Sequence, residues 1–344
     1  MRTLVAALAA AGSLVVPAFA AAPPGVIVFS RLVGDDRELY SIRPDGTGLT
    51  RLTDDAEDEG EPVLSPDRRL IASAGEEELL IRSASGQLVR RIAVPVEGAI
   101  GEPRWAPTGG WIAFLVERSD KDDNEDEDDA ADATAALRPP ADLWIARRDA
   151  TVAQRLVAAN VSTNDLVAAY AWSPNGRSLV FERLQRPALV VVDVPSRRSR
   201  VLRGTGRFAS SDPSWARNGR IVFARQRGRF QGYDLFTIRA DGKGLRRLAR
   251  ARSAARPTWS RDGRRVAFLD YRPAAGNRWL VTVVRANGRG RRQVGVATSD
   301  AALVWSPDGT RLLWQSRSNQ IIVGRADGRG SPRVLTTGGV PDWR

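Results

Sequence analysis

Short apolar runs recur along the chain, separated by turns rich in Gly, Asn and Asp. Runs such as "LIASA" at 70–74, "SLVFE" at 178–182 and "RVAFL" at 265–269 are each followed by a variable loop and a further run such as "DLFTIR" at 234–239. Five- to seven-residue β-rich runs bounded by turn residues are typical of antiparallel meanders. We find no long helical period after the N-terminal segment, so the pattern predicts an all-β fold.

A repeated phrase marks the same point in each unit, and "WSPDGT" at 305–310 is its clearest copy. The residue that begins the phrase occupies seven equivalent positions: Leu64, Trp105, Trp172, Trp215, Trp259, Trp305 and Trp343. Successive positions lie 41, 67, 43, 44, 46 and 38 residues apart. Apart from one gap that holds an insertion, these spacings lie close to the period of about 40–45 residues of a four-stranded propeller blade.

The two ends of the chain carry complementary parts of one unit. Residues 26–52 contain the last three strands of a unit without its first, and "GVPDWR" at 339–344 contains only a first strand. We therefore expect a single β-propeller of four-stranded antiparallel blades, closed by N- and C-terminal strands that share one blade. Counting the shared blade predicts seven blades; six is the alternative, if the first unit is misassigned.

The phrase itself is interpreted as a blade corner. Pro, Asp and Gly suit successive positions of a type I turn followed by a residue with positive φ. The preceding Trp is expected to pack between neighbouring blades, where an aromatic side chain buries roughly 150–250 Å². The spacing differs from the Ser-x-Asp-x-Gly-x-x-Trp box of sialidases, because Gly309 follows Asp308 directly.

The repeated Trp-Ser-Pro-Asp-Gly, with a later Asp-Gly hairpin in the same unit, resembles the TolB-type propeller repeat, a WD-like repeat. The resemblance covers residues 21–344 and implies a propeller fold in an exported bacterial protein. It does not extend to the α/β domain that precedes the propeller in TolB, so a Tol–Pal role is not implied. Similar propellers precede the hydrolase domain of prolyl-oligopeptidase-like enzymes, and we expect no such domain here.

The composition narrows the chemistry. The 344 residues include no Cys and no His, which excludes disulfides, thiolate ligands, Cys nucleophiles and the Ser-His-Asp triad. The net charge is +12, and all but two of the 52 basic residues, Lys121 and Lys243, are Arg. This excess either reflects coding bias or favours an anionic partner.

The N-terminus has the features of a secretory signal peptide. Arg2 provides a positive n-region, residues 4–16 are apolar, and Ala18-Phe19-Ala20 fits a cleavage site. We expect residues 1–20 to be removed and residues 21–344 to reside in the periplasm or outside the cell. No later segment reaches the ~20 apolar residues of a membrane span. Because we expect the protein to be exported, nucleic acid is not an expected partner.

The variable residues ahead of each anchor are the candidate ligand site. Three residues before the anchors lie Glu61, Glu102, Ala169, Asp212, Arg256, Ala302 and Val340. These positions should face the channel mouth, and the loop "DDAEDEGEP" at 54–62 would add further carboxylates there. Glu61, Glu102, Asp212 and Arg256 are the candidate residues of an acidic mouth that binds a cation or a basic segment. The alternative is a set of solvated turn residues.

The long gap holds an acidic insertion at 119–142. Its Asp120, Asp122, Asn124 and Asp126 have the opening spacing of a calcium loop, but the Gly at its sixth position and the Glu at its twelfth are missing. Dense like charge favours a flexible loop, with a weak calcium site as the alternative. No other cofactor is expected.

Arginine clusters at 196–200, 245–252 and 288–293 fall near the third turn and the outermost strand of their units. They should lie on the perimeter, where they protect sheet edges or contact an anionic envelope surface. We expect a monomeric, non-enzymatic exported binding or scaffold protein that holds a protein or an anionic envelope polymer. The alternative is a propeller lyase or glycosidase that uses carboxylates at the channel mouth.

Overall fold

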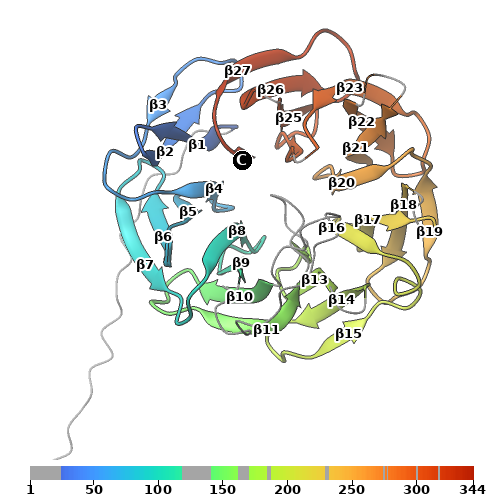
Figure 1. The fold of residues 1–344 in the computed structure, drawn as a ribbon, viewed down its shortest axis with the longest axis horizontal. Helices are drawn as coiled ribbons and strands as arrows, with labels where there is room; N and C mark the ends of the chain where they lie inside the picture. Colours follow the sequence, from blue (N-terminus) through green and yellow to red (C-terminus); the bar gives the residue numbers. More distant parts are fainter. Residues whose placement is uncertain are drawn as a thin grey trace, which may run out of the picture.

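Seven antiparallel sheets surround a central axis in the computed structural model, following one another in chain order around the ring (Figure 1). The structure describes residues 25–117, 141–161, 170–183, 187–228, 232–273, 276, 278–299, 301–316 and 318–344. Within these ranges every named element is a strand, β1 to β28. The predicted all-β propeller of seven four-stranded blades is confirmed, and the six-bladed alternative is wrong.

The blades are numbered here from the first complete one. Blade 1 contains β4 (Gly60–Leu64), β5 (Leu70–Ala74), β6 (Glu78–Ser83) and β7 (Leu88–Ala93). Blade 2 contains β8 (Ala99–Trp105), β9 (Trp111–Glu117), β10 (Ala141–Arg147) and β11 (Gln154–Val161). Blade 3 contains β12 (Tyr170–Trp172), β13 (Ser178–Arg183), β14 (Ala188–Asp193) and β15 (Ser199–Val201). A β11–β13 pairing at Val161 and Arg183 joins blades 2 and 3 into one continuous sheet.

The remaining blades follow the same order. Blade 4 contains β16 (Ser210–Trp215), β17 (Arg220–Gln226), β18 (Tyr233–Arg239) and β19 (Arg246–Ala249). Blade 5 contains β20 (Ala254–Trp259), β21 (Arg265–Arg272), β22 (Arg278–Arg285) and β23 (Arg292–Ala297). Blade 6 contains β24 (Val304–Trp305), β25 (Arg311–Gln315), β26 (Gln320–Arg325) and β27 (Arg333–Thr337). Blade 7 contains β28 (Asp342–Trp343), β1 (Ile27–Val33), β2 (Asp36–Ile42) and β3 (Thr50–Arg51).

The core lies between the blades. Seven hydrophobic clusters are present, and each combines residues of two neighbouring blades. The second and third strands are apolar on both faces, because each packs against a blade on either side; β5 and β10 are almost entirely buried. Continuous rather than alternating apolar runs therefore mark the strands that lie inside the ring. Among the described residues no helix is long and apolar enough to cross a membrane.

The repeated Ser-Pro-Asp-Gly phrase forms the corner between the first and second strands of a blade. In blade 6 the Gly309 N–H donates to the Ser306 carbonyl at 2.8 Å, and Gly309 has a φ of 66°. The Ser306 hydroxyl donates to Asp308 Oδ1 at 2.5 Å and accepts from the Arg311 N–H at 2.9 Å. In blade 1 the glycine position of the corner is held by Arg68, with a φ of 58°.

Both ends of the described chain meet in blade 7, as the complementary fragments predict. Trp343 pairs with Ile27, and the Gly25 N–H donates to the Arg344 carbonyl at 2.7 Å. The Asp342 carboxylate also accepts from the Leu64 N–H of blade 1 at 2.9 Å. The short C-terminal strand therefore connects the first and last parts of the ring, and the predicted closure is confirmed.

Candidate functional site

Four of the variable residues ahead of the anchors have the same unusual backbone. Glu61, Glu102, Asp212 and Arg256 have φ values of 52°, 55°, 52° and 52°, and each precedes a proline. In each blade the pairing with the second strand shifts register at this point. A residue other than glycine in the left-handed backbone region costs roughly 1–2 kcal/mol. Bulges and left-handed residues of this kind redirect side chains and are concentrated at functional sites.

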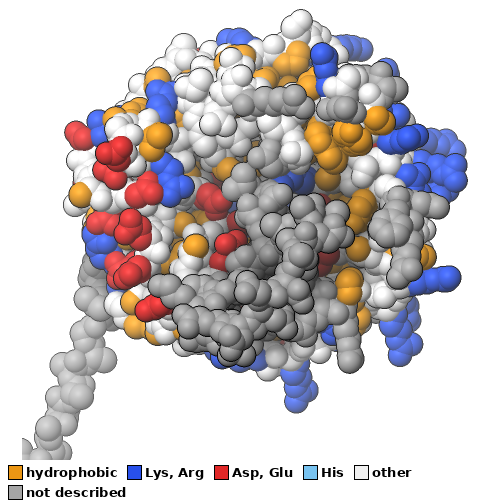
Figure 2. Space-filling model, viewed as in Figure 1, with side chains coloured by type: hydrophobic (Ala, Val, Ile, Leu, Met, Phe, Trp, Pro, Cys, Tyr) orange, Lys and Arg blue, Asp and Glu red, His pale blue; other side chains and the backbone are white. Residues whose placement is uncertain are grey.

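These four side chains line one pocket of about 270 Å³ at the axis of the ring. Arg104, Tyr170, Asp342 and Arg344 also line it, so the pocket contains groups of both charges. Figure 2 shows carboxylates at the hollow centre of this face. The structure thus brings together Glu61, Glu102, Asp212 and Arg256 as the repeat alignment predicts. Ala302 and Val340, from the same repeat position, contribute apolar parts of the lining.

Two of the carboxylates also connect neighbouring blades. One Glu61 oxygen accepts a hydrogen bond from the backbone N–H of Glu102. Asp212 Oδ2 accepts from the backbone N–H of Arg256 at 3.1 Å. These bonds connect the left-handed residues of adjacent blades to one another. The other Asp212 oxygen, Oδ1, and Glu102 Oε2 are buried without a hydrogen bond within the described chain.

The pocket changes the acidity of its carboxyl groups. Burial raises the pKa of Glu102 to about 8; Arg104 and Arg256 oppose this rise, whereas Glu61 and Asp212 add to it. Burial also raises the pKa of Glu61 above its ordinary value. Glu102 forms an ion pair with Arg104, whose Nη2 lies 3.9 Å from Glu102 Oε2. Glu102 is therefore mostly protonated at neutral pH and available as a hydrogen-bond donor or as a carboxylate for an incoming cation.

Glu182 is an ionisable residue that the repeat alignment did not identify. It lies near the end of β13, is 7% exposed, and has an oxygen without a hydrogen bond. Burial raises its pKa well above the ordinary value, and the Asp212 charge adds to the effect. The signal in the sequence was the Glu that ends "SLVFE", at a position where "RIVFA" and "RVAFL" have Ala and Leu.

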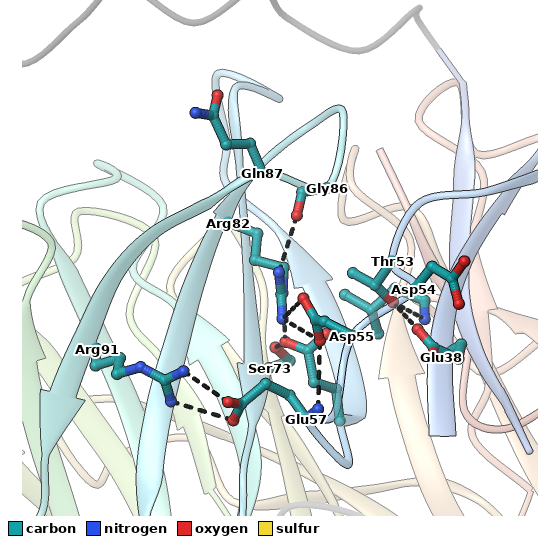
Figure 3. A network of polar contacts seen from close by, with 12 residues as sticks. Glu38, Thr53, Asp54, Asp55, Glu57, Ser73, Arg82, Gly86, Gln87 and Arg91 are labelled. Carbon is teal, nitrogen blue, oxygen red and sulfur yellow. Dashed lines mark hydrogen bonds and ion pairs between the residues drawn. The ribbon is translucent and has the colours of Figure 1, made fainter. Parts of the chain in front are cut away.

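The carboxylates of the loop before β4 do not belong to the pocket lining, so this part of the expected acidic mouth is wrong. Glu59 is fully buried and accepts from Arg82 Nε and from the Ser73 hydroxyl, both at 2.8 Å. Figure 3 shows Arg82 and Ser73 in this network, with Asp55 beside Arg82. Arg82 also contacts Asp55 at 2.9 Å. The other loop carboxylates pair with arginines of blades 1 and 7, as Glu57 with Arg91, Asp58 with Arg37, and Asp54 with Arg51.

The tryptophan anchors lie at the junctions between blades. Five are buried and Trp215 is half-buried. Four indole N–H groups donate to backbone carbonyls: Trp105 to Val63, Trp172 to Arg104, Trp305 to Thr258 and Trp343 to Gly25. In the first three cases the acceptor lies one residue before the anchor of the preceding blade. These tryptophans therefore connect successive blades, and Trp105 and Trp172 also belong to the lining of the channel pocket.

The proposed calcium ligands Asp120, Asp122, Asn124 and Asp126 lie outside the described residues, as do residues 1–20. The strand β10 begins at Ala141, so the last two residues of the predicted insertion belong to blade 2. Asp142 is buried there and lies 3.3 Å from Arg155. Within the described ranges no group of three or more acidic residues is arranged to hold a metal ion.

Comparisons with known proteins extend the description of the fold. No family model matches the sequence, and no curated protein matches it. Among solved structures, TolB from Acinetobacter baumannii is similar with a TM-score of 0.55 and 16% identity, covering 93% of this chain and 82% of TolB. The oligogalacturonate lyase of Vibrio parahaemolyticus is similar with a TM-score of 0.60 and 11% identity, covering 92% of this chain and 87% of the lyase.

A puromycin-hydrolyzing peptidase of Mycobacterium tuberculosis is also similar, with a TM-score of 0.61 and 14% identity. The match covers 90% of this chain and 53% of the peptidase, so this chain spans about half of that protein. The neighbours thus include both TolB and enzymes, and identities this low indicate a shared fold and not a shared activity. By fold, the chain is a seven-bladed, TolB-like β-propeller.

Proposed function

We propose that the chain is a non-enzymatic binding protein of the cell envelope, which holds a partner protein at the channel mouth. The observation that supports this is the pocket at the axis, where four blades present a charged residue from the same strained position. Strain repeated in four blades at one surface is costly for stability, and ligand sites are where such strain is usually retained.

The chemistry of the pocket favours a positively charged nitrogen. Glu102 Oε2 and Asp212 Oδ1 are buried acceptors without a hydrogen bond in the described chain, and Glu61 lies beside them. An ammonium or guanidinium group would donate to these oxygens and replace the proton on Glu102. We therefore propose a lysine or arginine side chain of the partner as the group that enters the pocket.

Binding of a labelled trilysine peptide, followed by fluorescence anisotropy, tests this proposal. Glu102→Gln and Asp212→Asn should each weaken binding at least tenfold, whereas Glu77→Gln, an exposed carboxylate outside the pocket, should change it less than twofold. Affinity should rise between pH 6 and pH 9, because the cation must displace the Glu102 proton. Equal affinities for all four proteins would refute the assignment.

Envelope location remains a prediction from residues 1–20, to which the fold similarity with TolB adds support. Cell fractionation together with N-terminal sequencing of the purified protein would test it. A mature N-terminus at Ala21 in the envelope or culture fluid is the expected result. An intact Met1 in the cytoplasm would contradict both export and the envelope role.

A glycosidase or lyase is the second candidate, and one observation favours it. Glu102 has a raised pKa and shares its pocket with three further carboxyl groups, those of Glu61, Asp212 and Asp342. A protonated acid beside a second carboxylate is the arrangement that glycoside cleavage requires. Turnover on a panel of polysaccharides that is lost in Glu102→Gln would establish this activity. Absence of turnover, with peptide binding retained, would support the binding role.

A further inference from the structure

A second pocket lies at the perimeter, between blades 4 and 5. It is an open cleft of about 690 Å³, and arginines provide most of its lining: Arg227, Arg250, Arg252, Arg272 and Arg291, together with Gly232 and Ala251. Figure 2 shows basic side chains gathered on this side of the ring, near β19 and β23, and acidic ones on the opposite side, near β2 to β7. The cleft therefore lies in the most basic part of this face.

A buried aspartate orients two of the arginines. Asp270, at the end of β21, is 1% exposed, and its Oδ2 accepts from Arg272 Nε at 2.7 Å and from Arg291 Nη2. Its other oxygen accepts from the backbone N–H of Arg252 at 3.2 Å. Arg291 also lies over the Phe268 ring, 5.3 Å from the ring centroid. Since the carboxylate is shared, neither guanidinium is free to turn away from the cleft.

Backbone carbonyls fix the remaining wall. Arg227 donates to the carbonyls of Gly232 at 3.2 Å and Arg252 at 2.9 Å. Arg291 donates to the Arg250 carbonyl at 2.7 Å. A second buried aspartate, Asp234, accepts from the Ala251 N–H at 3.0 Å. The segment that carries Arg250 and Arg252 is therefore held from both sides, by blade 4 and by blade 5.

The positive charges of Arg250 and Arg252 on that segment are not paired with an acidic side chain among the described residues. The guanidinium groups of Arg250 and Arg252 are exposed, and neither has a hydrogen bond or ion pair in the described part of the chain. Five arginines line the cleft, and the two aspartates in contact with this region, Asp234 and Asp270, do not neutralise them, since Asp234 also pairs with Arg247. Repulsion among fixed cations opposes folding, and long side chains on a surface normally relieve it by moving apart. Here the contacts described above prevent this movement for Arg227, Arg272 and Arg291.

We infer that this cleft binds an oligoanion with closely spaced oxyanion groups, either phosphates or carboxylates. Guanidinium groups pair with both by two parallel N–H···O bonds, and a fixed guanidinium loses little freedom when it does so. The volume is that of a small-molecule site, large enough for a ligand of a few units and much larger than a single phosphate needs. Arg227, Arg272 and Arg291 form the fixed wall, and Arg250 and Arg252 complete the site at its entrance.

This inference rests on the binding role proposed above but uses a different surface, so the two can fail separately. The test is calorimetric titration at ~50 mM salt with tripolyphosphate and with a triuronate, a trimer of uronic acids. The Arg250→Ala/Arg252→Ala double variant should weaken binding at least tenfold. The side chains are exposed and unpaired, so the fold should be unaffected, and the variant should still bind trilysine like the original protein.

A matched control removes two charges from elsewhere on the surface. Arg203→Ala/Arg329→Ala changes exposed arginines that do not line the cleft, and it should alter affinity less than twofold. Binding of one probe alone would support the inference and identify the oxyanion, and binding of both would support the shared chemistry. Binding of neither at millimolar concentration would overturn it. Equal losses in the two double variants, or binding only to vesicles of anionic lipid, would also overturn it.

Discussion

Replacing Glu102 by Gln should make the protein more stable at alkaline pH and leave its stability unchanged at acid pH. Burial raises the pKa of Glu102 from 4.5 to about 8, so the folded state retains a proton that the unfolded chain has lost. The stabilisation that this proton reflects is fully present below pH 4.5 and is lost as the pH rises from 4.5 to 8. Glutamine has the same shape and cannot ionise.

The size of the change in unfolding free energy follows from the width of the pH window between the two pKa values of Glu102. Each pH unit is worth about 1.4 kcal/mol, which gives an upper limit of about 5 kcal/mol across the window. The Glu102 side chain is 13% exposed and lies near Arg104, so partial hydration and the ion contact should reduce the gain to about 2–4 kcal/mol at pH 8. Glu61, Asp212 and Arg256 also face this group, and their charges shift the midpoint of the change. Tyr170 lies beside it as well, but burial raises the pKa of its hydroxyl, so it carries no charge in this pH range.

Urea denaturation of both proteins at pH 4.5, 6, 7 and 8 measures the effect. The difference in unfolding free energy should grow with pH, with most of the change between pH 5 and pH 8. Glu77→Gln, which alters an exposed carboxylate, should give a constant difference below about 0.5 kcal/mol. Parallel stability curves for Glu102→Gln and the original protein would refute the argument that Glu102 is buried as a neutral acid.

Three further substitutions test other parts of the ring by the same denaturation assay. Trp259→Ala should lower the unfolding free energy by about 3–5 kcal/mol, because it empties a junction between two blades; an unchanged urea midpoint would contradict this. Arg82→Met should cost about 3–5 kcal/mol at pH 7, because it leaves the Glu59 charge buried without its cation, and a cost below 1 kcal/mol would contradict the pairing. Arg68→Gly should raise stability by about 0.5–1 kcal/mol, since glycine adopts the left-handed corner without strain, and a loss of stability would contradict this.

The blade corners and the ring closure could be predicted from the sequence because both depend on local patterns. "WSPDGT" specifies its own turn, and Ser306 and Asp308 make the predicted corner without help from distant residues. The order of strands then places Trp343 beside Ile27. Equivalent positions of a repeat must also occupy equivalent places, which is why Glu61, Glu102, Asp212 and Arg256 are found together.

The pairing of charges could not be predicted in the same way. Whether Glu57 and Asp58 face the channel or an arginine depends on which side chains the neighbouring strands present, and Arg91 and Arg37 come from different blades. The arginine cleft has the same origin, because its walls combine side chains of two successive blades whose packing against each other is set only in the folded ring. The burial of a residue such as Glu182 depends on how deep its strand lies inside the ring, and a run of apolar residues in the sequence does not indicate that depth.

Blade 7 combines an early strand and a late strand of the chain, and this arrangement has a consequence for biosynthesis. The chain places β1 near its beginning and the partner of β1, residues 342–343, near its end. At roughly 5–20 residues per second, β28 would emerge roughly 15–60 s after β1. During that interval one edge of β1 has unpaired backbone groups that other nascent chains could bind. This edge of β1 therefore stays open to pairing with other chains until residues 342–343 have been synthesised.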